Sequence, residues 1–443
     1  STPYLKKFFD TLEIAEKDWM SICNATYKNG ILFNQWSSIA GHRQYFHPFF
    51  SELDEQNLLD FEESTRQKRH GYDVVAHPDK YFFMTALTKQ AKLAKAPDNF
   101  PYENLYGYHF DSHLLGGFLK SHATSLSVKH IEAKVESVIQ HASGNICSVT
   151  LDNGNDVSGD IFIDCTGFRA LLIEKTLKVP FHSYSHELLN DSAVALPSNK
   201  HSIEMPQTVS TAFSNGWAWR IPLTNRIGNG YVYSSHHQSA SSAEAELREK
   251  LKGNVHNVAA KHLKMKIGRL EKHWFKNCLA VGLSQGFIEP LEATALHLVQ
   301  NTIEQFMALF EKGGFTTKEQ TFFNAQTNFG FDRIKDYIVL HYITSSRKDT
   351  QYWQDVRNTS EISESLKRIL NIWFAGGDLR AELEQQNINN YYSSMSWHVM
   401  FGGNGVYPAV NNASLVSKNS EHLLKINKIN KININKYNFT TTL

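Results

Sequence analysis

The spacing of apolar residues predicts helices and strands that alternate along the chain. The first 20 residues carry apolar side chains at helical intervals, whereas Ile31 and Phe33 alternate with their neighbours as in a short strand. Lys28 stands at the entrance of that strand. A further helix is expected within residues 81–95, before a Pro/Asn turn cluster at 97–101. These patterns predict a mixed α/β chain.

The middle of the chain predicts a β-meander and part of a central sheet. Strand-like runs cover residues 128–139, 146–151 and 160–164, with Gly- and Asn-containing turns between them. The third run is almost entirely apolar up to Thr166-Gly167, which is typical of a strand buried on both faces. Residues 109–119 precede the meander with an apolar helical stripe, so we expect a core helix there.

Later segments predict a hairpin, a long helix and a disordered tail. The hairpin covers residues 207–235, with Trp217, Trp219 and Ile221 on one face. The long helix starts near Glu289-Pro290 and ends at Gly313, and it places Glu292 in its first turn. Residues 423–443 are an Ile/Asn/Lys repeat, which favours disorder.

Composition excludes several classes of function. The 45 Lys and Arg nearly balance the 44 Asp and Glu, for a net charge of +1, so nucleic acid is not an expected partner. The four cysteines form no C-x-x-C pair, which predicts neither disulfides nor a metal site. No run of 18 apolar residues and no signal-peptide pattern is found. We expect a soluble, cytoplasmic protein with no membrane contact and a small, partly apolar ligand.

A dinucleotide-binding loop is not complete in the sequence. Residues 228–230 and 403–405 both read Gly-Asn-Gly, but neither continues to G-x-G-x-x-G or joins a strand to a helix N-terminus. We interpret both as turns.

Three motifs resemble the flavin-dependent tryptophan halogenases. They are Phe162-Ile163-Asp164-Cys165-Thr166-Gly167-Phe168-Arg169, Gly216-Trp217-Ala218-Trp219-Arg220-Ile221-Pro222 and Phe287-Ile288-Glu289-Pro290-Leu291-Glu292-Ala293-Thr294. The resemblance runs from residue 1 to about residue 408. It implies a core like that of FAD-dependent monooxygenases over residues 1–345, with interleaved substrate-binding segments, and a mainly helical lobe over 346–422. It also implies that the first βαβ unit, with its pyrophosphate-binding Gly loop, is missing before Ser1.

The same resemblance assigns candidate catalytic and halide-binding residues. Lys28, in Asn24-Ala25-Thr26-Tyr27-Lys28, would bind hypohalous acid or form a haloamine with it; an exposed surface lysine is the alternative. Glu292 would orient the halogen and accept the ring proton, unless it only offsets the helix dipole. The amides of Thr294 and Ala295 would bind the halide ion, as helix N-termini bind anions.

Aromatic residues are the candidates for substrate binding. His47 and Phe49 resemble the family residues that stack on the indole, and core packing is the other explanation. Tyr391 and Tyr392 lie where free-tryptophan halogenases have a glutamate followed by Phe-Trp, and the position that matches the glutamate is Asn387. A missing carboxylate would weaken binding of the ammonium of free tryptophan, which favours another indole or a phenol.

The remaining candidates are implied to face the cofactor. In the family, the tryptophan motif walls the substrate off from the flavin hydroperoxide; its residues here are Trp217, Trp219, Ile221 and Pro222. Three aliphatic residues match flavin contacts, although core packing explains them equally well: Val135, Leu283 and Leu296.

Taken together, the resemblance implies a flavin-dependent halogenase. Reduced FAD from a separate flavin reductase, oxygen and a halide ion would yield hypohalous acid, which then halogenates an indole or other electron-rich aromatic substrate; the expected assembly includes a homodimer. One alternative is an inactive, truncated remnant that does not bind FAD, motivated by the Ser start and the repetitive tail. Another is a flavin monooxygenase that hydroxylates its substrate.

Overall fold

The computed structural model describes residues 1–437 except 201, 252–254, 256, 360, 410–414, 417 and 418. The chain forms two compact units, and each is built from separated segments. Unit 1 comprises Ser1–Asp111, Leu189–Lys264 and Asp336–Leu443, and unit 2 comprises Ser112–Leu188 and Met265–Lys335. This division differs from the consecutive 1–345, 346–422 and 423–443 segments predicted from the sequence, because strand partners distant in sequence decide it.

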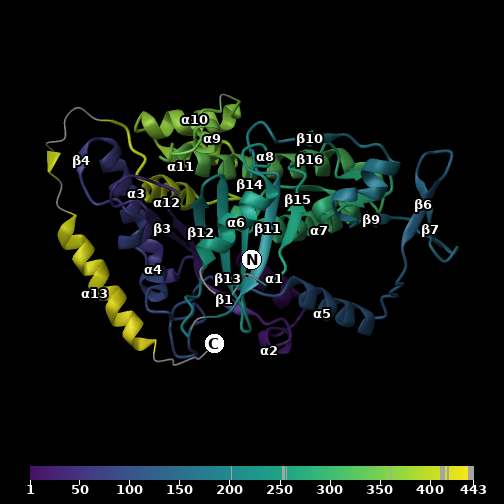
Figure 1. Cartoon of the computed structure of the whole chain (residues 1–443), viewed down its shortest axis with the longest axis horizontal. Helices are drawn as coiled ribbons and strands as arrows, with labels where there is room; N and C mark the ends of the chain where they lie inside the picture. The colour runs from purple at the N-terminus through teal and green to yellow at the C-terminus, as the bar shows by residue number, and fades with distance from the viewer. Residues whose placement is uncertain are drawn as a thin grey trace. The chain divides into compact units, whose positions relative to one another are not determined.

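The centre of unit 1 is a seven-stranded sheet (Figure 1). Its neighbouring strands pair antiparallel except β12 and β2, which run parallel. The predicted hairpin is confirmed as β13 and β14, and β12 pairs with the other edge of β13. In spatial order the strands are β15 (Lys261–Lys264), β11 (Ser192–Ser198), β14 (Ile227–Tyr233), β13 (Gly216–Pro222), β12 (Thr208–Phe213), β2 (Gly30–Asn34) and β3 (Gln44–Pro48).

Side-chain alternation separates the two faces of this sheet. Ala218 and Tyr231 are directly opposite each other and pack with Leu247 of α6 (Ala240–Leu251) in an apolar cluster. Trp217 and Trp219 point to the other face. Residues 228–230, interpreted above as a turn, lie within strand β14 instead, because their register with β13 is continuous.

A two-stranded ribbon and several helices complete unit 1. The ribbon pairs β1 (Thr26–Lys28) antiparallel with β5 (Gly107–His109). Helix α3 (Glu55–Arg69) was not predicted, because that segment is mostly polar. Where disorder was predicted, residues 420–436 form α13 (Ser420–Lys436), with Leu423 and Ile426 buried; residues 438–443 lie outside the described part. The other elements are α1 (Tyr4–Thr11), α2 (Glu16–Trp19), α4 (Phe83–Thr88), α9 (Gln351–Arg357), α10 (Glu364–Phe374), α11 (Leu379–Gln385), α12 (Ser394–Asn404) and the strand pair β4 (Tyr72–Asp73) and β20 (Leu415–Val416).

Unit 2 contains three small sheets rather than one long meander. The first two predicted strands are β6 and β7, but their third partner is β8, and the apolar run is β9 in another sheet. Ile163 of β9 is 47% exposed, so that strand is not buried on both faces as predicted. The sheets are β6 (Val135–Gln140), β7 (Ile146–Leu151) and β8 (Asp156–Ser158); β17 (Trp274–Phe275), β18 (Cys278–Ala280) and β9 (Phe162–Asp164); and β10 (Phe181–Ser183), β16 (Gly268–Leu270) and β19 (Gly286–Phe287).

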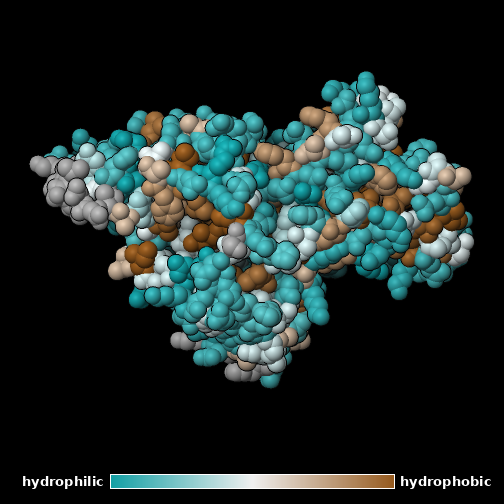
Figure 2. Space-filling model, turned by 90° about the horizontal axis from the view of Figure 1, so that it is seen from above, coloured by the Kyte–Doolittle hydropathy of each residue, from teal (hydrophilic) through white to brown (hydrophobic). Residues whose placement is uncertain are grey.

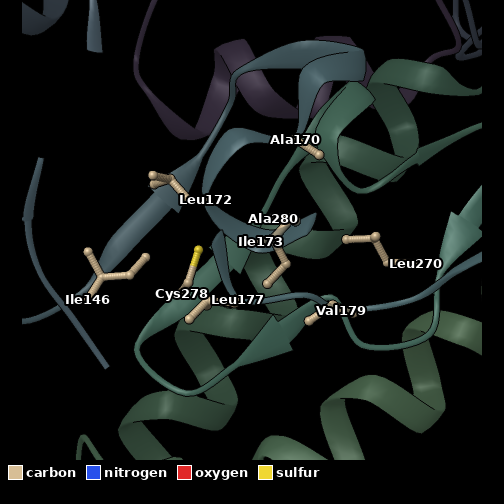
Figure 3. Packing of buried hydrophobic residues seen from close by; sticks show 9 residues of the cluster. All are labelled: Ile146, Ala170, Leu172, Ile173, Leu177, Val179, Leu270, Cys278 and Ala280. Atoms are coloured by element: carbon tan, nitrogen blue, oxygen red, sulfur yellow. The ribbon is translucent and has the colours of Figure 1, made fainter. Parts of the chain in front are cut away.

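An apolar cluster joins these sheets to a short helical segment, Leu171–Thr176. Figure 3 shows Leu172, Ile173 and Leu177 gathered near Cys278 and Ala280 of β18. Asp164, at the end of β9, accepts hydrogen bonds from the amides of Leu172 and Ile173 (2.8 and 2.9 Å), which caps that segment.

The long helices of unit 2 depart from prediction at their starts and in their burial. Helix α5 (Ser112–Ser125) was expected in the core, yet Leu115 is its one buried residue. A stripe of apolar side chains shows that a helix is amphipathic but not what covers it. The long helix α7 (Ala295–Lys312) begins three residues after Glu292, and α8 (Gln320–Thr344) follows it along the chain.

None of the described helices is long and apolar enough to span a bilayer. On the face in Figure 2, hydrophilic residues predominate and hydrophobic residues occur in separate groups. All four cysteines are free thiols, with Cys23 and Cys278 buried.

Candidate active site

Lys28 is buried at the end of strand β1. Its side chain is 1% exposed, and its ammonium nitrogen lies 5.4 Å from the ring centre of Phe49. The structure therefore excludes the exposed surface lysine that the sequence left open. It also brings together two of the predicted site residues, because the amide of Phe49 donates to the carbonyl of Asn29 (2.8 Å).

The residue after Lys28 is held by its own side chain. Asn29 is fully buried, and its amide nitrogen donates to the Thr88 hydroxyl and the Lys92 carbonyl, both at 2.9 Å. Its side-chain oxygen accepts from the Ala94 amide (2.8 Å). Three hydrogen bonds of a buried side chain fix the backbone beside Lys28.

A hydrogen-bonded chain joins the lysine strand to the tryptophan motif. The Thr26 hydroxyl donates to the carbonyl of Pro222 (2.7 Å) and lies 3.3 Å from Nδ1 of His109. Since the hydroxyl hydrogen is used at Pro222, Thr26 accepts from Nδ1–H, and the unprotonated Nε2 accepts from the Thr208 hydroxyl (2.9 Å). Burial, and then the positive charge of Lys28, hold the pKa of His109 well below its ordinary value. His109 is therefore neutral.

His47 and the two tryptophans share one face of the seven-stranded sheet. His47 is opposite Ile31, Ile31 is opposite Thr208, and two residues further along β12 Ser210 is opposite Trp219. His47 is 9% exposed and lies edge-on to Phe50 at 6.5 Å. The structure thus places these predicted aromatic residues on the face opposite α6.

The tryptophan pair depends on a glycine in the neighbouring strand. The rings of Trp217 and Trp219 are 6.2 Å apart. Trp219 is directly opposite Gly230, and a Cβ atom on Gly230 would lie 2.0 Å from Cζ2 of the indole. The ring therefore occupies the space that a side chain at position 230 would fill.

Tyr391 and Tyr392 lie between helices α11 and α12. The Tyr392 ring stacks on Tyr337 at 3.6 Å with an angle of 16°. Asn387 has a positive φ of 54° in the turn that precedes them. Asn tolerates this conformation better than most residues, which is a structural reason for its presence there.

Unit 2 holds the predicted residues Glu292, Thr294 and Ala295 in a 3-10 turn followed by a helix, rather than in one continuous helix. Glu292 ends a 3-10 turn (Pro290–Glu292), Ala293 has a positive φ of 57°, and helix α7 begins at Ala295. Glu292 is thus outside the helix rather than in its first turn, because the left-handed Ala293 separates the two elements. Thr294 is buried, and its hydroxyl oxygen has no hydrogen-bond partner in the described part of the chain.

A cavity of about 170 Å³ adjoins the start of α7. Its lining is almost wholly apolar and includes Leu283, Leu296 and Ala295 together with Phe287 and Phe331. The structure thus brings two of the three predicted cofactor contacts to one cavity. Val135, the third, is in strand β6 and does not line it.

A larger cavity of about 290 Å³ lies in unit 1, on the α6 side of the sheet. Arg220 and Arg347 line it, and each is already ion-paired, with Glu204 and Asp349. The lining also includes Ala218 and Trp219, so this cavity adjoins the tryptophan motif from the α6 side of the sheet.

Comparisons with known proteins identify the family. The family model described as tryptophan halogenase matches residues 1–419. The chain is 35% identical over 401 residues to the 7-chloro-L-tryptophan 6-halogenase KtzR of Kutzneria sp. (strain 744), covering 83% of this chain and 75% of that protein. It is 34% identical over 414 residues to the tryptophan 6-halogenase SttH of Streptomyces toxytricini, covering 88% and 77%.

Solved structures agree with this result. The crystal structure of SttH superposes with a TM-score of 0.84 at 29% identity, covering 98% of this chain and 88% of that one. BrvH, a flavin-dependent halogenase from Brevundimonas sp. BAL3, gives 0.82 at 30% identity, with the same coverages. The fold is that of the flavin-dependent halogenases. The chain belongs to the tryptophan halogenase family, whose members are oxidoreductases that use FAD and a halide ion.

The residues of unit 2 fit those two ligands. Thr294 offers a buried hydroxyl without a partner in the described part, and the first amides of α7 have no acceptor within their helix. The apolar cavity beside them suits an aromatic ring system. No sequence pattern indicated a role for Thr26, Asn29 or His109, because a lone polar residue carries no signal of burial.

Proposed function

We propose that this protein is a flavin-dependent halogenase that acts on an indole or another electron-rich aromatic compound. The observation that carries the proposal is the burial of Lys28 beside Phe49, in a strand hydrogen-bonded to the last residue of the tryptophan motif. Lysine is almost never buried without a specific partner or role. The family match over residues 1–419 supports the same reading.

FAD and halide are assigned to the start of α7. Leu283 and Leu296 would contact the flavin ring, while Thr294 and the amide of Ala295 would bind the halide. Val135 remains a third proposed flavin contact. When bound, reduced FAD supplies hypohalous acid from oxygen and the halide, and a separate flavin reductase keeps it reduced. A homodimer belongs to the same proposal.

Lys28 receives the electrophilic halogen. Its amine either holds hypohalous acid by a hydrogen bond or reacts with it: an N–X bond forms, the O–X bond breaks and water leaves. A ring carbon of the substrate then attacks the halogen, and the displaced electron pair returns to the amine or to hydroxide. Glu292 keeps the role that its motif position implies and accepts the ring proton.

Aromatic side chains position the substrate and separate it from the flavin. His47, Phe49, Tyr391 and Tyr392 would provide flat surfaces for the ring. Trp217 and Trp219, with Ile221 and Pro222, would form the wall. Asn387 offers no carboxylate for an ammonium group, so we expect indoles or phenols without an amino acid group to be turned over at least as well as free tryptophan.

The first test is FAD binding by the full chain, followed by turnover. Flavin fluorescence is titrated, and then reductase, halide and a panel of tryptophan, indole, tryptamine and phenols are added with product analysis by mass spectrometry. A halogenated product supports the proposal, whereas a hydroxylated product would indicate the monooxygenase. Absence of FAD binding would indicate the inactive alternative.

Variants of two lysines test the assignment of Lys28. We expect Lys28→Met to abolish halogenation while flavin oxidation continues. Lys89→Met is the matched control, because Lys89 is in the same unit but its side chain is 57% exposed. Halogenation retained in the Lys28 variant contradicts the role proposed for it.

A further inference from the structure

One carboxylate on helix α2 binds three tyrosines and a lysine. Oε1 of Glu16 accepts hydrogen bonds from the hydroxyls of Tyr106 (2.9 Å) and Tyr108 (2.7 Å). Oε2 accepts from the hydroxyl of Tyr27 (2.8 Å) and from the ammonium of Lys95. A carboxylate has about four lone-pair sites, so these four donors use its full capacity. We call this group the Glu16 cluster.

The cluster keeps one protonation state around neutral pH. Burial alone would raise the pKa of Glu16, but the hydrogen bonds from Lys95, Tyr108, Tyr27 and Tyr106 together hold it below its ordinary value. Burial, and then the adjacent Glu16, raise the pKa of each tyrosine. The carboxylate is therefore ionised and the three hydroxyls remain donors.

The cluster acts on the strand that carries Lys28. In the ribbon, Tyr27 is opposite Tyr108 and Lys28 is opposite Gly107. Side chains alternate along a strand, so Tyr27 and Tyr108 meet Glu16 on one face while Lys28 and Thr26 point to the other. Both faces of the ribbon are thus tied by hydrogen bonds, to Glu16 on one side and to Pro222 and Thr208 on the other.

Lys95 extends this support to the other neighbour of Lys28. It lies directly after Ala94, whose amide donates to the side chain of Asn29. The segment 92–95 is therefore linked to Tyr27, before Lys28, through Glu16. It also binds the side chain of Asn29, after Lys28, directly. Such a closed arrangement leaves the backbone of Lys28 little freedom to move.

We propose that Glu16 is a positioning residue for Lys28, fixing the β1–β5 ribbon so that the lysine amine meets halogen and substrate in one orientation. The inference rests on the proposed function only where it assigns a catalytic purpose to the fixed orientation of Lys28. The fixing of the lysine itself can be measured without turnover. Misplacement of a reacting group by about 1 Å can lower a rate about 100-fold, so a positioning residue that touches no substrate can still govern the yield.

Glu16→Gln tests the proposal with little change in size. A glutamine oxygen offers about two acceptor sites and its NH₂ group can only donate, so two of the four donors lose their acceptor. Glu246→Gln is the matched control, since Glu246 on α6 accepts three hydrogen bonds from Ser214 and Gln238. Tyr27→Phe removes a single donor and serves if the first variant does not fold.

Two measurements are made on each variant of the full chain. The first is the ¹⁵Nζ resonance of Lys28 in lysine-labelled protein, assigned by its loss in Lys28→Arg. The second is halogenated product per oxygen consumed, with reductase, FAD and halide present. We expect Glu16→Gln to shift or broaden the resonance and to lower the product ratio by about tenfold or more, with a smaller effect of Tyr27→Phe and none of Glu246→Gln.

The outcomes separate the two proposals. An unchanged Lys28 resonance in Glu16→Gln and Tyr27→Phe overturns the positioning role, whatever the activity. If the Lys28 resonance shifts in Glu16→Gln but the wild-type chain makes no halogenated product, the proposed function is refuted. The positioning of Lys28 by Glu16 then still holds. A shift of equal size in Glu246→Gln would show a general loss of stability and would also overturn the inference.

Discussion

Adding one methyl group at Gly230 should displace a tryptophan of the motif. In Gly230→Ala the new Cβ would lie 2.0, 2.2 and 2.5 Å from three atoms of the Trp219 indole. Ordinary van der Waals contact begins near 3.4 Å, so the nearest ring atom must retreat by about 1.4 Å. Overpacking of this kind costs about 1 to 3 kcal/mol. We expect a loss of about 2 kcal/mol in the free energy of unfolding, because Trp219 is only half-buried and can partly swing away.

The same strand provides the control. A Cβ at Gly228 would find only the Ile221 carbonyl oxygen, at 3.8 Å, so Gly228→Ala should be tolerated. Both variants are measured by urea unfolding and by tryptophan emission. If Trp219 belongs to the proposed wall, product per oxygen consumed also falls in Gly230→Ala but not in Gly228→Ala.

A double-mutant cycle isolates the contact. Once Trp219 is truncated in Trp219→Ala, the added methyl group meets no ring, and the cost of Gly230→Ala should disappear. A cost that persists without the indole, or a Gly230→Ala variant as stable as the wild type with unchanged emission, would refute the packing described for this pair.

Three further predictions concern buried charges. Burial raises the pKa of Asp54 to about 6, so its contribution to the free energy of unfolding is greatest below about pH 4 and is lost as the pH rises through 6. Thermal melts should show Asp54→Asn gaining up to about 3 kcal/mol on the wild type between pH 4 and 8. A difference that stays constant with pH would contradict this prediction. Burial lowers the pKa of His398 to about 3, so the free energy of unfolding should fall by up to about 1.4 kcal/mol per pH unit below about pH 6.5. His398→Asn removes this titration. If the stability of the variant fell as steeply with decreasing pH as that of the wild type, the assignment would be wrong. Asp332 accepts two hydrogen bonds of 3.0 Å from Arg269, and its side chain is 31% exposed. Asp332→Asn should therefore lower the free energy of unfolding in urea by about 2 kcal/mol, less than the loss of a fully buried pair would. An unchanged urea midpoint would argue against the pair.

Local pattern was sufficient where neighbours in sequence are also neighbours in space. The alternation around Trp217 and Trp219 predicted β13, β14 and the face that the indoles share. The motif around Glu292 predicted a helix that starts near Pro290, whereas α7 starts at Ala295, after the left-handed Ala293 that places Glu292 outside the helix. A single backbone angle of that kind leaves no periodic trace in the sequence.

Long-range pairing could not be predicted in the same way. Ile31 pairs with Thr208 in a parallel register, and no local pattern couples segments so far apart. The exposure of Ile163 and of most of α5 shows the same limit, since apolar composition indicates a tendency to burial and not the surface that would supply it. Among the candidate residues, Glu16 and His109 acquire their importance from partners on other elements.

The interleaved segments also determine the order in which the protein can form during synthesis. Strand β2 emerges from the ribosome long before β12, its parallel partner, and α8 and the helices after it follow later still. Until residue 208 has been made, β2 lacks the partner strand on its second edge, and such incomplete sheets are open to aggregation or to binding by chaperones. Unit 2 must likewise hold residues 112–188 until 265–335 arrive. Heterologous production should therefore respond more to translation rate and chaperone supply than the stability of the finished chain would suggest.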